Sequence, residues 1–217
     1  MPVTKNEVLE WIHNYAQVIA ENKTYLTELD SAIGDADHGA NMDRGFRAVL
    51  EKLPGVEDQD IEKILMAVAM ALLSKVGGAG GPLYSTLFMQ MGKSLNGKTE
   101  FELEDWAKAL DAATQGVVRL GKASPGDKTM VDALTPAVQA LKDASQEGLS
   151  LEEGLKKSAK AAEEGMIATI PLVARKGRAS YLGERSAGHQ DPGATSTFML
   201  LDTAVKTWAN SNISNQN

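Results

Sequence analysis

Apolar side chains recur every three or four residues along almost the whole chain of 217 residues. In the first such segment they are Val8, Trp11, Ile12, Tyr15 and Ile19. This spacing places them on one face of an α-helix. No alternating strand pattern of useful length competes with it. The sequence therefore predicts an all-α fold.

The periodic segments predict eight or nine amphipathic helices. Capping boxes, in which a hydroxyl residue is followed three positions later by glutamate, mark helix starts at Thr4 and Ser150. The predicted helices cover roughly 5–21, 24–32, 40–53, 58–75, 81–95, 103–120, 129–145, 150–172 and 193–210. A chain of this length can bury one substantial core, so we expect residues 1–217 to form a single domain.

Composition excludes several classes of function. The chain has no cysteine, which rules out disulfides and thiolate zinc sites. A formal charge of -7 argues against bulk binding of nucleic acid. The most apolar stretch, residues 64–73, is too short to span a bilayer, and we see no leader segment. We therefore expect a cytoplasmic protein that binds neither nucleic acid nor membrane.

Four of the predicted connections carry glycine clusters and polar side chains suited to chemistry. They read IGDADHG from residue 33, VGGAGGP from residue 76, GKASPGDKT from residue 121 and RKGRASYLGERSAGHQDPG from residue 175. We call them the first to fourth loops. In an up-and-down bundle they are every second connection, so all four emerge at the same end. That end is the predicted site.

The first loop gathers carboxylates that call for a counter-charge. Asp30, Asp35 and Asp37 offer hard oxygen ligands, which suit Mg²⁺ or Ca²⁺. An EF-hand calcium loop is excluded. If Asp35 is its first position, Ala40 and Phe46 stand where the loop requires glycine and glutamate. Mg²⁺ bridging to phosphate is one interpretation. The other is that these aspartates only cap the helix that follows.

The second loop has a run of glycines directly before a helix start at Pro82. Backbone amides there could bind an anion, since the helix N-terminus carries partial positive charge. The loop lacks the lysine and hydroxyl of a P-loop. A tight turn without a ligand is the alternative.

The fourth loop is basic, with Arg175, Lys176, Arg178 and Arg185. An arginine beside a magnesium site could clamp a phosphate, although a solvated surface loop explains any single one of them. Its His189, like His38 of the first loop, is either a ligand contact or a structural histidine.

Taken together, four motifs carry a family resemblance. They are GDADHGANMDRG, GGAGGPLYST, PGDKTMVDAL and RKGRASYLGERSAGHQDPGATS. In this order they resemble the nucleotide-binding L subunits of bacterial dihydroxyacetone kinases. The resemblance extends from the first predicted helix to the last. It implies a barrel of eight antiparallel amphipathic helices, with ADP or ATP and two Mg²⁺ ions in the loops at one end.

The resemblance also implies roles for individual residues. Metal binding falls to Asp30, Asp35 and Asp37, and the catalytic contribution falls to Arg178. The implied nucleotide contacts are His38, Gly39, Asn41, Ala79, Gly80, Gly121, Met130, Arg178, Asp191, Pro192 and Gly193. One position departs from the family, which commonly has serine where this chain has Gly80. Phosphate binding there would rely on backbone amides.

The implied activity needs partner subunits. Bound ADP would act as a coenzyme, phosphorylated in place by the phosphohistidine donor M subunit of a phosphotransferase system. The γ-phosphoryl group would then pass to dihydroxyacetone on a separate K subunit. Two alternatives stay open: a subunit that uses exchangeable ATP with a K protein, and a non-catalytic nucleotide sensor that binds a regulator.

Overall fold

The computed structural model describes residues 1–209, which are almost entirely helical. The α-helices are α1 (Lys5–Glu21), α2 (Lys23–Ile33), α3 (His38–Lys52), α4 (Ile61–Lys75), α5 (Gly80–Ser94), α6 (Leu103–Gly121), α7 (Met130–Gln146), α8 (Leu151–Ala168) and α9 (Pro192–Trp208). Two 3-10 segments are η1 (Leu53–Gly55) and η2 (Arg178–Ser186), and two short strands are β1 (Val3–Thr4) and β2 (Glu100–Phe101).

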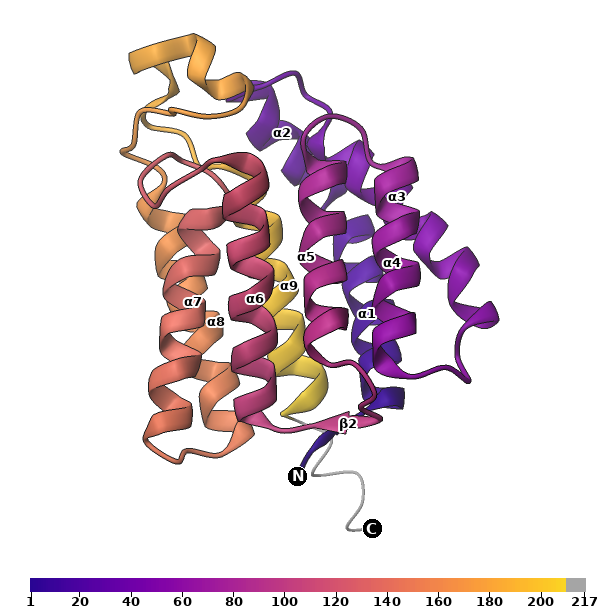
Figure 1. The fold of residues 1–217 in the computed structure, drawn as a ribbon. Coiled ribbons are helices and arrows are strands. Elements are labelled where there is room, and N and C mark those ends of the chain that lie inside the picture. Colours follow the sequence, from indigo (N-terminus) through magenta and orange to yellow (C-terminus); the bar gives the residue numbers. More distant parts are fainter. Residues whose placement is uncertain (210–217) are drawn as a thin grey trace.

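Eight of the α-helices close into a barrel (Figure 1). From α3 to α9 each helix packs against the next, α9 packs against α1, and α1 packs against α3. The remaining helix, α2, contacts α3, α9 and η2 and lies at one end. The predicted all-α barrel of about eight antiparallel helices is thus confirmed.

Helix boundaries follow local capping chemistry. The capping boxes at Thr4 and Ser150 are both formed, as predicted. Helix α4 begins later than predicted, because the Asp60 side chain accepts a hydrogen bond from the Lys63 amide and caps the helix there. Helix α8 ends four residues before the predicted residue 172. Pro171 explains this end, since proline disfavours helical conformation in the residue before it.

Some elements were not predicted. The β1–β2 pair joins Val3 to Phe101 in antiparallel register, and two residues per strand leave no alternation to detect. The η2 segment interrupts a loop expected to lack regular structure. The predicted last helix reaches residue 210, which lies outside the described residues.

Aromatic side chains fill the barrel between α1, α5, α6 and α9. The Trp11 ring lies 5.7 Å from the Trp106 ring and 5.0 Å from the Trp208 ring, measured between centroids. Trp11 also donates a hydrogen bond from Nε1 to the carbonyl of Leu200 at 3.1 Å. This packing fixes α1 against α9 and closes the barrel.

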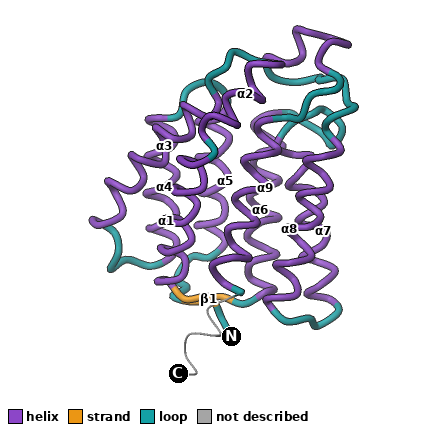
Figure 2. Tube along the Cα trace, turned by 180° about the vertical axis from the view of Figure 1, so that it is seen from behind, coloured by secondary structure: helices purple, strands orange, loops and turns teal. Residues whose placement is uncertain are grey.

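The two ends of the barrel differ in their connections. The long connection from α8 to α9, which contains η2, lies at one end, and the N-terminus and the β1–β2 pair lie at the other (Figure 2). We call the end that carries η2 the loop pole. Among the described helices none is both long enough and apolar enough to cross a membrane.

Candidate functional site

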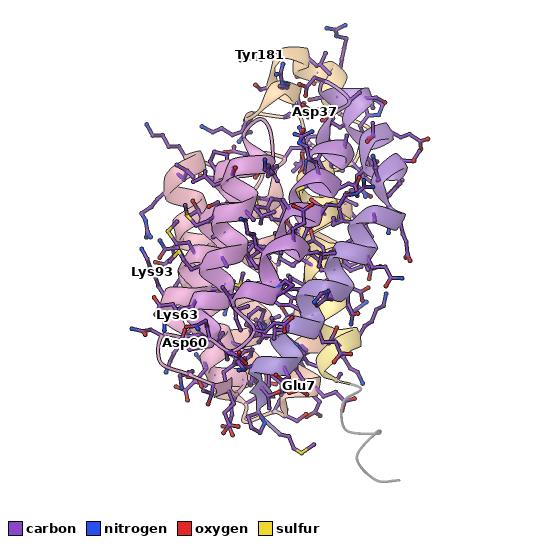
Figure 3. All side chains as sticks on the ribbon, turned by 90° about the vertical axis from the view of Figure 1, so that its right-hand side faces the viewer. Glu7, Asp37, Asp60, Lys63, Lys93 and Tyr181 are labelled. Atoms are coloured by element: carbon purple, nitrogen blue, oxygen red, sulfur yellow. The ribbon has the colours of Figure 1, made fainter. Side chains whose placement is uncertain are left out.

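All four predicted loops contribute to one pocket at the loop pole. Its lining includes Asp37 of the first loop, Gly78 of the second, Thr129 of the third and Arg178 of the fourth. The convergence expected from alternate connections of an up-and-down bundle is therefore observed. In Figure 3 Asp37 lies at this pole, beneath the tip of η2 marked by Tyr181.

Three carboxylates converge on one side of the pocket. Asp30, Asp35 and Asp37 each offer a ligand oxygen, and these oxygens lie within 4.8 Å of one another. Asp30 is buried near the end of α2, and its Oδ2 accepts hydrogen bonds from the amides of Asp37 and His38 at 2.8 and 3.1 Å. These bonds fold the first loop back onto α2. The all-oxygen donor set fits a hard divalent cation such as Mg²⁺.

Arg178 faces this cluster from the start of η2. Its Nε donates to Asp35 Oδ2 at 2.9 Å, while the arginine side chain remains 65% exposed. One guanidinium cannot neutralise three carboxylates, so the cluster keeps a net negative charge suited to a cation.

His38 is held by a buried hydrogen-bond network. Its Nε2 lies 2.9 Å from Ser196 Oγ, which lies 2.7 Å from the Tyr84 hydroxyl. Ser196 has one proton, and it donates to the carbonyl of Pro192 at 3.0 Å. Ser196 Oγ thus links the His38 ring to the Tyr84 hydroxyl and to the backbone of α9, which fixes the orientation of the imidazole. Burial lowers the pKa of His38, against the opposing charges of Asp30 and Asp37.

The second loop presents backbone amides to the pocket. Helix α5 begins at Gly80 after Ala79, and no side chain caps its first turn. Val76, Gly77, Gly78 and Ala79 all line the pocket. Uncapped amides at a helix N-terminus form a ready anion site, so the loop can bind phosphate without the serine hydroxyl.

The remaining predicted contacts divide into two groups. Asn41, Met130 and the turn Asp191, Pro192 and Gly193 line the pocket. Gly39 and Gly121 lie outside the lining formed by the described residues. At Gly39 a Cβ atom would lie 2.0 Å from the carbonyl oxygen of Lys23, so this glycine permits close packing of α3 on α2. A Cβ atom at Gly121 would contact Leu83, which does line the pocket.

Asp191 is the pocket carboxylate with the most perturbed ionisation. Its side chain caps α9 by accepting from the Ala194 amide at 2.7 Å. Burial raises the pKa of Asp191 to about 7, against the opposing effects of this hydrogen bond and of the charge on Lys128. Asp191 is therefore poised to exchange a proton near neutral pH.

Among the pocket-lining residues not named as candidates from the sequence, two are buried and carry polar side-chain groups. Lys128 and Tyr84 line the pocket, yet both are almost fully buried, 1% exposed each. Lys128 belongs to the PGDKT motif of the third loop, which was placed at the predicted site without a role for its lysine. Tyr84 follows Pro82 by two residues, and nothing in that spacing indicated contact with α9.

The first basic residues of the fourth loop divide between pocket and surface. Lys176 lines the pocket, and Arg175 lies with its Nη1 4.0 Å from Asp127. Arg185 is exposed outside the lining of described residues, as the surface interpretation expects. His189 is also exposed, and it contributes its backbone carbonyl to Lys128 rather than its ring to the pocket lining. His13 is exposed on α1, as expected.

Residues 32–206, most of the chain, match the family model described as the DAK2 domain. The chain belongs to the DAK2 domain family. This DAK2 chain is 44% identical over 201 residues to the "PEP-dependent dihydroxyacetone kinase, ADP-binding subunit DhaL" of Escherichia coli (strain K12). That match covers 93% of this chain and 96% of the relative.

A second relative gives the same picture. The "PTS-dependent dihydroxyacetone kinase, ADP-binding subunit DhaL" of Lactococcus lactis is 41% identical over 204 residues, covering 94% of this DAK2 chain and 98% of the relative. The family resemblance seen in the four motifs is therefore confirmed.

Solved structures share the fold of this DAK2 chain. The dihydroxyacetone kinase of C. freundii in its native form matches with a TM-score of 0.71 at 23% identity, covering 91% of this chain. The same enzyme in complex with AMP-PNP and Mg²⁺ matches with a TM-score of 0.69 at 23% identity, covering 95% of this chain. This DAK2 chain spans about a third of those longer chains, 33% and 34%.

Proposed function

We propose that this chain is the nucleotide-binding subunit of a dihydroxyacetone kinase, a phosphotransferase that works only with partner subunits. One observation carries the proposal: a three-carboxylate cluster, an uncapped helix N-terminus and Arg178 face the same pocket. These are the groups needed to hold two Mg²⁺ ions and the phosphates of ADP or ATP. The names of the full-length bacterial relatives, ADP-binding subunits of PEP- or PTS-dependent dihydroxyacetone kinases, support it.

In this proposal each residue positions or stabilises charge. Asp30, Asp35 and Asp37 hold the metal ions, which neutralise phosphate charge when bound. The first-turn amides of α5 bind phosphate oxygens. Arg178 stabilises the negative charge that spreads over the transferred group. No side chain of the pocket need form a covalent intermediate, since phosphoryl transfer depends on in-line positioning.

The direction of transfer completes the proposal. A phosphohistidine on the M subunit gives its phosphoryl group to the β-phosphate of ADP, so a P–N bond breaks and a P–O bond forms. The resulting ATP passes its γ-phosphoryl group to a hydroxyl of dihydroxyacetone on the K subunit and returns to ADP. The nucleotide stays on this chain as a coenzyme throughout.

Exposed apolar side chains around the loop pole support docking of protein partners there. Apart from Met1, the large hydrophobic side chains exposed among residues 1–209 are Tyr25, Met70, Leu73, Leu120, Ile167 and Tyr181. Leu73, Leu120 and Ile167 lie in the last turns of helices that lead into pocket loops, and Tyr181 lies on η2. Exposed apolar groups around a site are typical of a protein interface.

Native mass spectrometry and an omission assay test this function. The purified chain should carry ADP and two magnesium ions. With M and K subunits, a phosphohistidine source and dihydroxyacetone, it should produce dihydroxyacetone phosphate. Omission of any one protein should abolish product. Turnover by the chain alone would contradict the division of labour.

Two further results would favour the alternatives. Rapid exchange of bound nucleotide with labelled ATP would favour the subunit that uses free ATP. Nucleotide binding without transfer in any combination of partners would favour the sensor.

A further inference from the structure

Lys128 is a buried cation at the base of the fourth loop. Its side chain is 1% exposed, and its Nζ donates to the carbonyl of Thr169 at 2.6 Å and to the carbonyl of His189. The carbonyl of Ile170 lies 3.4 Å away. Among residues 1–209 no carboxylate lies within ion-pair distance of Nζ, so carbonyl dipoles solvate the ammonium. Burial lowers the pKa of Lys128, and the charges of Asp191 and Asp132 oppose that effect.

The three carbonyls come from both ends of one chain segment. Thr169 and Ile170 directly follow α8, and His189 comes shortly before α9. Further hydrogen bonds join these ends, from the Gly188 amide to Ile170 at 2.7 Å and from the Asp191 amide to the Thr169 hydroxyl at 3.0 Å. Lys128 therefore joins the two points at which residues 171–188 leave and rejoin the barrel.

The backbone at Lys128 has a conformation that favours glycine. Its φ of +64° lies in the left-handed region, which is strained for a non-glycine residue. Glycine would adopt this conformation without strain. A lysine here keeps both the strain and a desolvated charge, and the bonds to the segment ends offset these costs.

Residues 171–188 carry Arg178, which reaches the aspartate cluster through Asp35. A neighbouring bond, from the Arg175 amide to the Asp127 carbonyl at 3.1 Å, ties the same segment to the third loop. Displacement of a reacting group by about 1 Å can cost about a hundredfold in rate. A shift of the segment ends would therefore carry Arg178 away from the aspartate cluster.

We propose that Lys128 is a positioning residue for phosphoryl transfer, whose ammonium clamps the ends of residues 171–188 and so sets Arg178 over the pocket. This rests on the proposed function. In this role the Lys128 ammonium is bound by backbone carbonyls in the way that a metal cation can be, and it is attached to the chain by its own side chain.

Chemical rescue gives the sharpest test. Lys128→Gly removes the side chain without backbone strain, and n-butylammonium reproduces what was removed. The variant should lose tenfold or more in the rate of transfer, with nucleotide affinity changed less than threefold. Added n-butylammonium should restore the rate in a saturable way. Uncharged n-butanol, of similar shape, should not. Failure of n-butylammonium to restore transfer in a folded variant would overturn the proposal.

A second variant and a second measurement guard against simple loss of folding. Lys128→Met keeps the apolar stem, and hydrogen exchange should rise in residues 171–188 while α8 and α9 stay protected. The matched control is Lys160→Met, at an exposed lysine on α8. It should change neither the rate of transfer nor the hydrogen exchange of residues 171–188. Unchanged exchange in residues 171–188 would contradict the clamp. This exchange measurement holds even if wild-type protein shows no transfer, so failure of the proposed function remains distinguishable.

Discussion

Arg178 and Asp35 form an ion pair across the mouth of the pocket, with Nε and Oδ2 2.9 Å apart. The side chains are 65% and 34% exposed, and pairs of this kind contribute at most about 1 kcal/mol. The two groups proposed to hold phosphate and metal are thus paired with each other. The pair is weak enough for ligands to replace it, so we expect Arg178 to compete with a bound cation for Asp35.

Arg178→Gln should therefore raise the affinity for Mg²⁺ when nucleotide is absent, by up to about fivefold, because an exposed pair is worth at most about 1 kcal/mol. Isothermal titration calorimetry on nucleotide-free protein measures this affinity. The same variant should slow transfer in the assay with all partners, since the planar charge is lost. Arg185→Gln, in the same segment, is the control and should change neither the Mg²⁺ affinity nor the rate of transfer. Weaker Mg²⁺ binding in Arg178→Gln would contradict the competition.

Asp37→Asn should release metal and nucleotide together. The change removes one anionic ligand from the cluster, and the metal ions are proposed to join protein to phosphate. Metal analysis and nucleotide content of the purified variant give the reading. Asp58→Asn, an exposed aspartate before α4, controls for the loss of one negative charge. Full retention of both ligands in Asp37→Asn would refute the metal site.

Gly80→Ser should tighten nucleotide binding by about 1 kcal/mol, the worth of one added hydrogen bond. The backbone permits the change, because Gly80 is the first residue of α5 and a Cβ atom there would meet only Val76, at 3.5 Å. Gly78→Ser is the contrasting variant. Gly78 has φ of +63°, so serine there should lower stability instead. Dissociation rates of ADP and thermal melting separate the two effects.

Asp191→Asn should change how stability depends on pH. The folded pKa of Asp191, about 7, lies above its unfolded value near 4, so the folded state binds more protons between these pH values. The contribution of Asp191 to the free energy of unfolding therefore falls as pH rises through this window. Asparagine can still cap α9 but does not titrate.

The difference in stability between this variant and wild type should therefore shift in favour of the variant from pH 5 to pH 7. The slope should be up to about 1.4 kcal/mol per pH unit. Urea unfolding at several pH values measures it, with Asp58→Asn as the control. A constant difference across that range would show that Asp191 keeps an ordinary pKa.

The barrel could be predicted from sequence because the features that define its helices lie within each helix segment. Each helix carries its own apolar stripe and, in several cases, its own cap, and alternate connections must share an end. The convergence of the first and fourth loops follows from that topology alone. The individual pocket contacts were assigned through the family motifs.

The rest depends on residues far apart in sequence. Lys128 is buried only because carbonyls of Thr169 and His189 surround it, and no local pattern encodes that. The His38 ring is held by Ser196, which lies on α9 and is far from His38 in sequence. Gly39 was assigned to the nucleotide site, but in the structure it allows α3 to pack closely on α2. Sequence alone does not distinguish a small residue that admits a ligand from one that admits a neighbouring helix.

Tyr181 offers the most direct test of partner docking. This residue is 87% exposed on η2, close in sequence to Arg178, and it does not belong to the pocket lining formed by residues 1–209. A buried aromatic side chain can contribute 2 kcal/mol or more to an interface, about thirtyfold in affinity. Tyr181→Ala should therefore slow transfer at low partner concentration, while the bound nucleotide, the metal content and the melting temperature stay unchanged.

Raising the concentration of the limiting partner should restore the rate of transfer, because docking rather than chemistry is affected. Leu73→Ser, in the last turn of α4, tests whether docking extends beyond η2 to the exposed apolar side chains on other helices. If Tyr181→Ala lowers the maximal rate with no change in the partner concentration required, the ring acts on the transfer step instead.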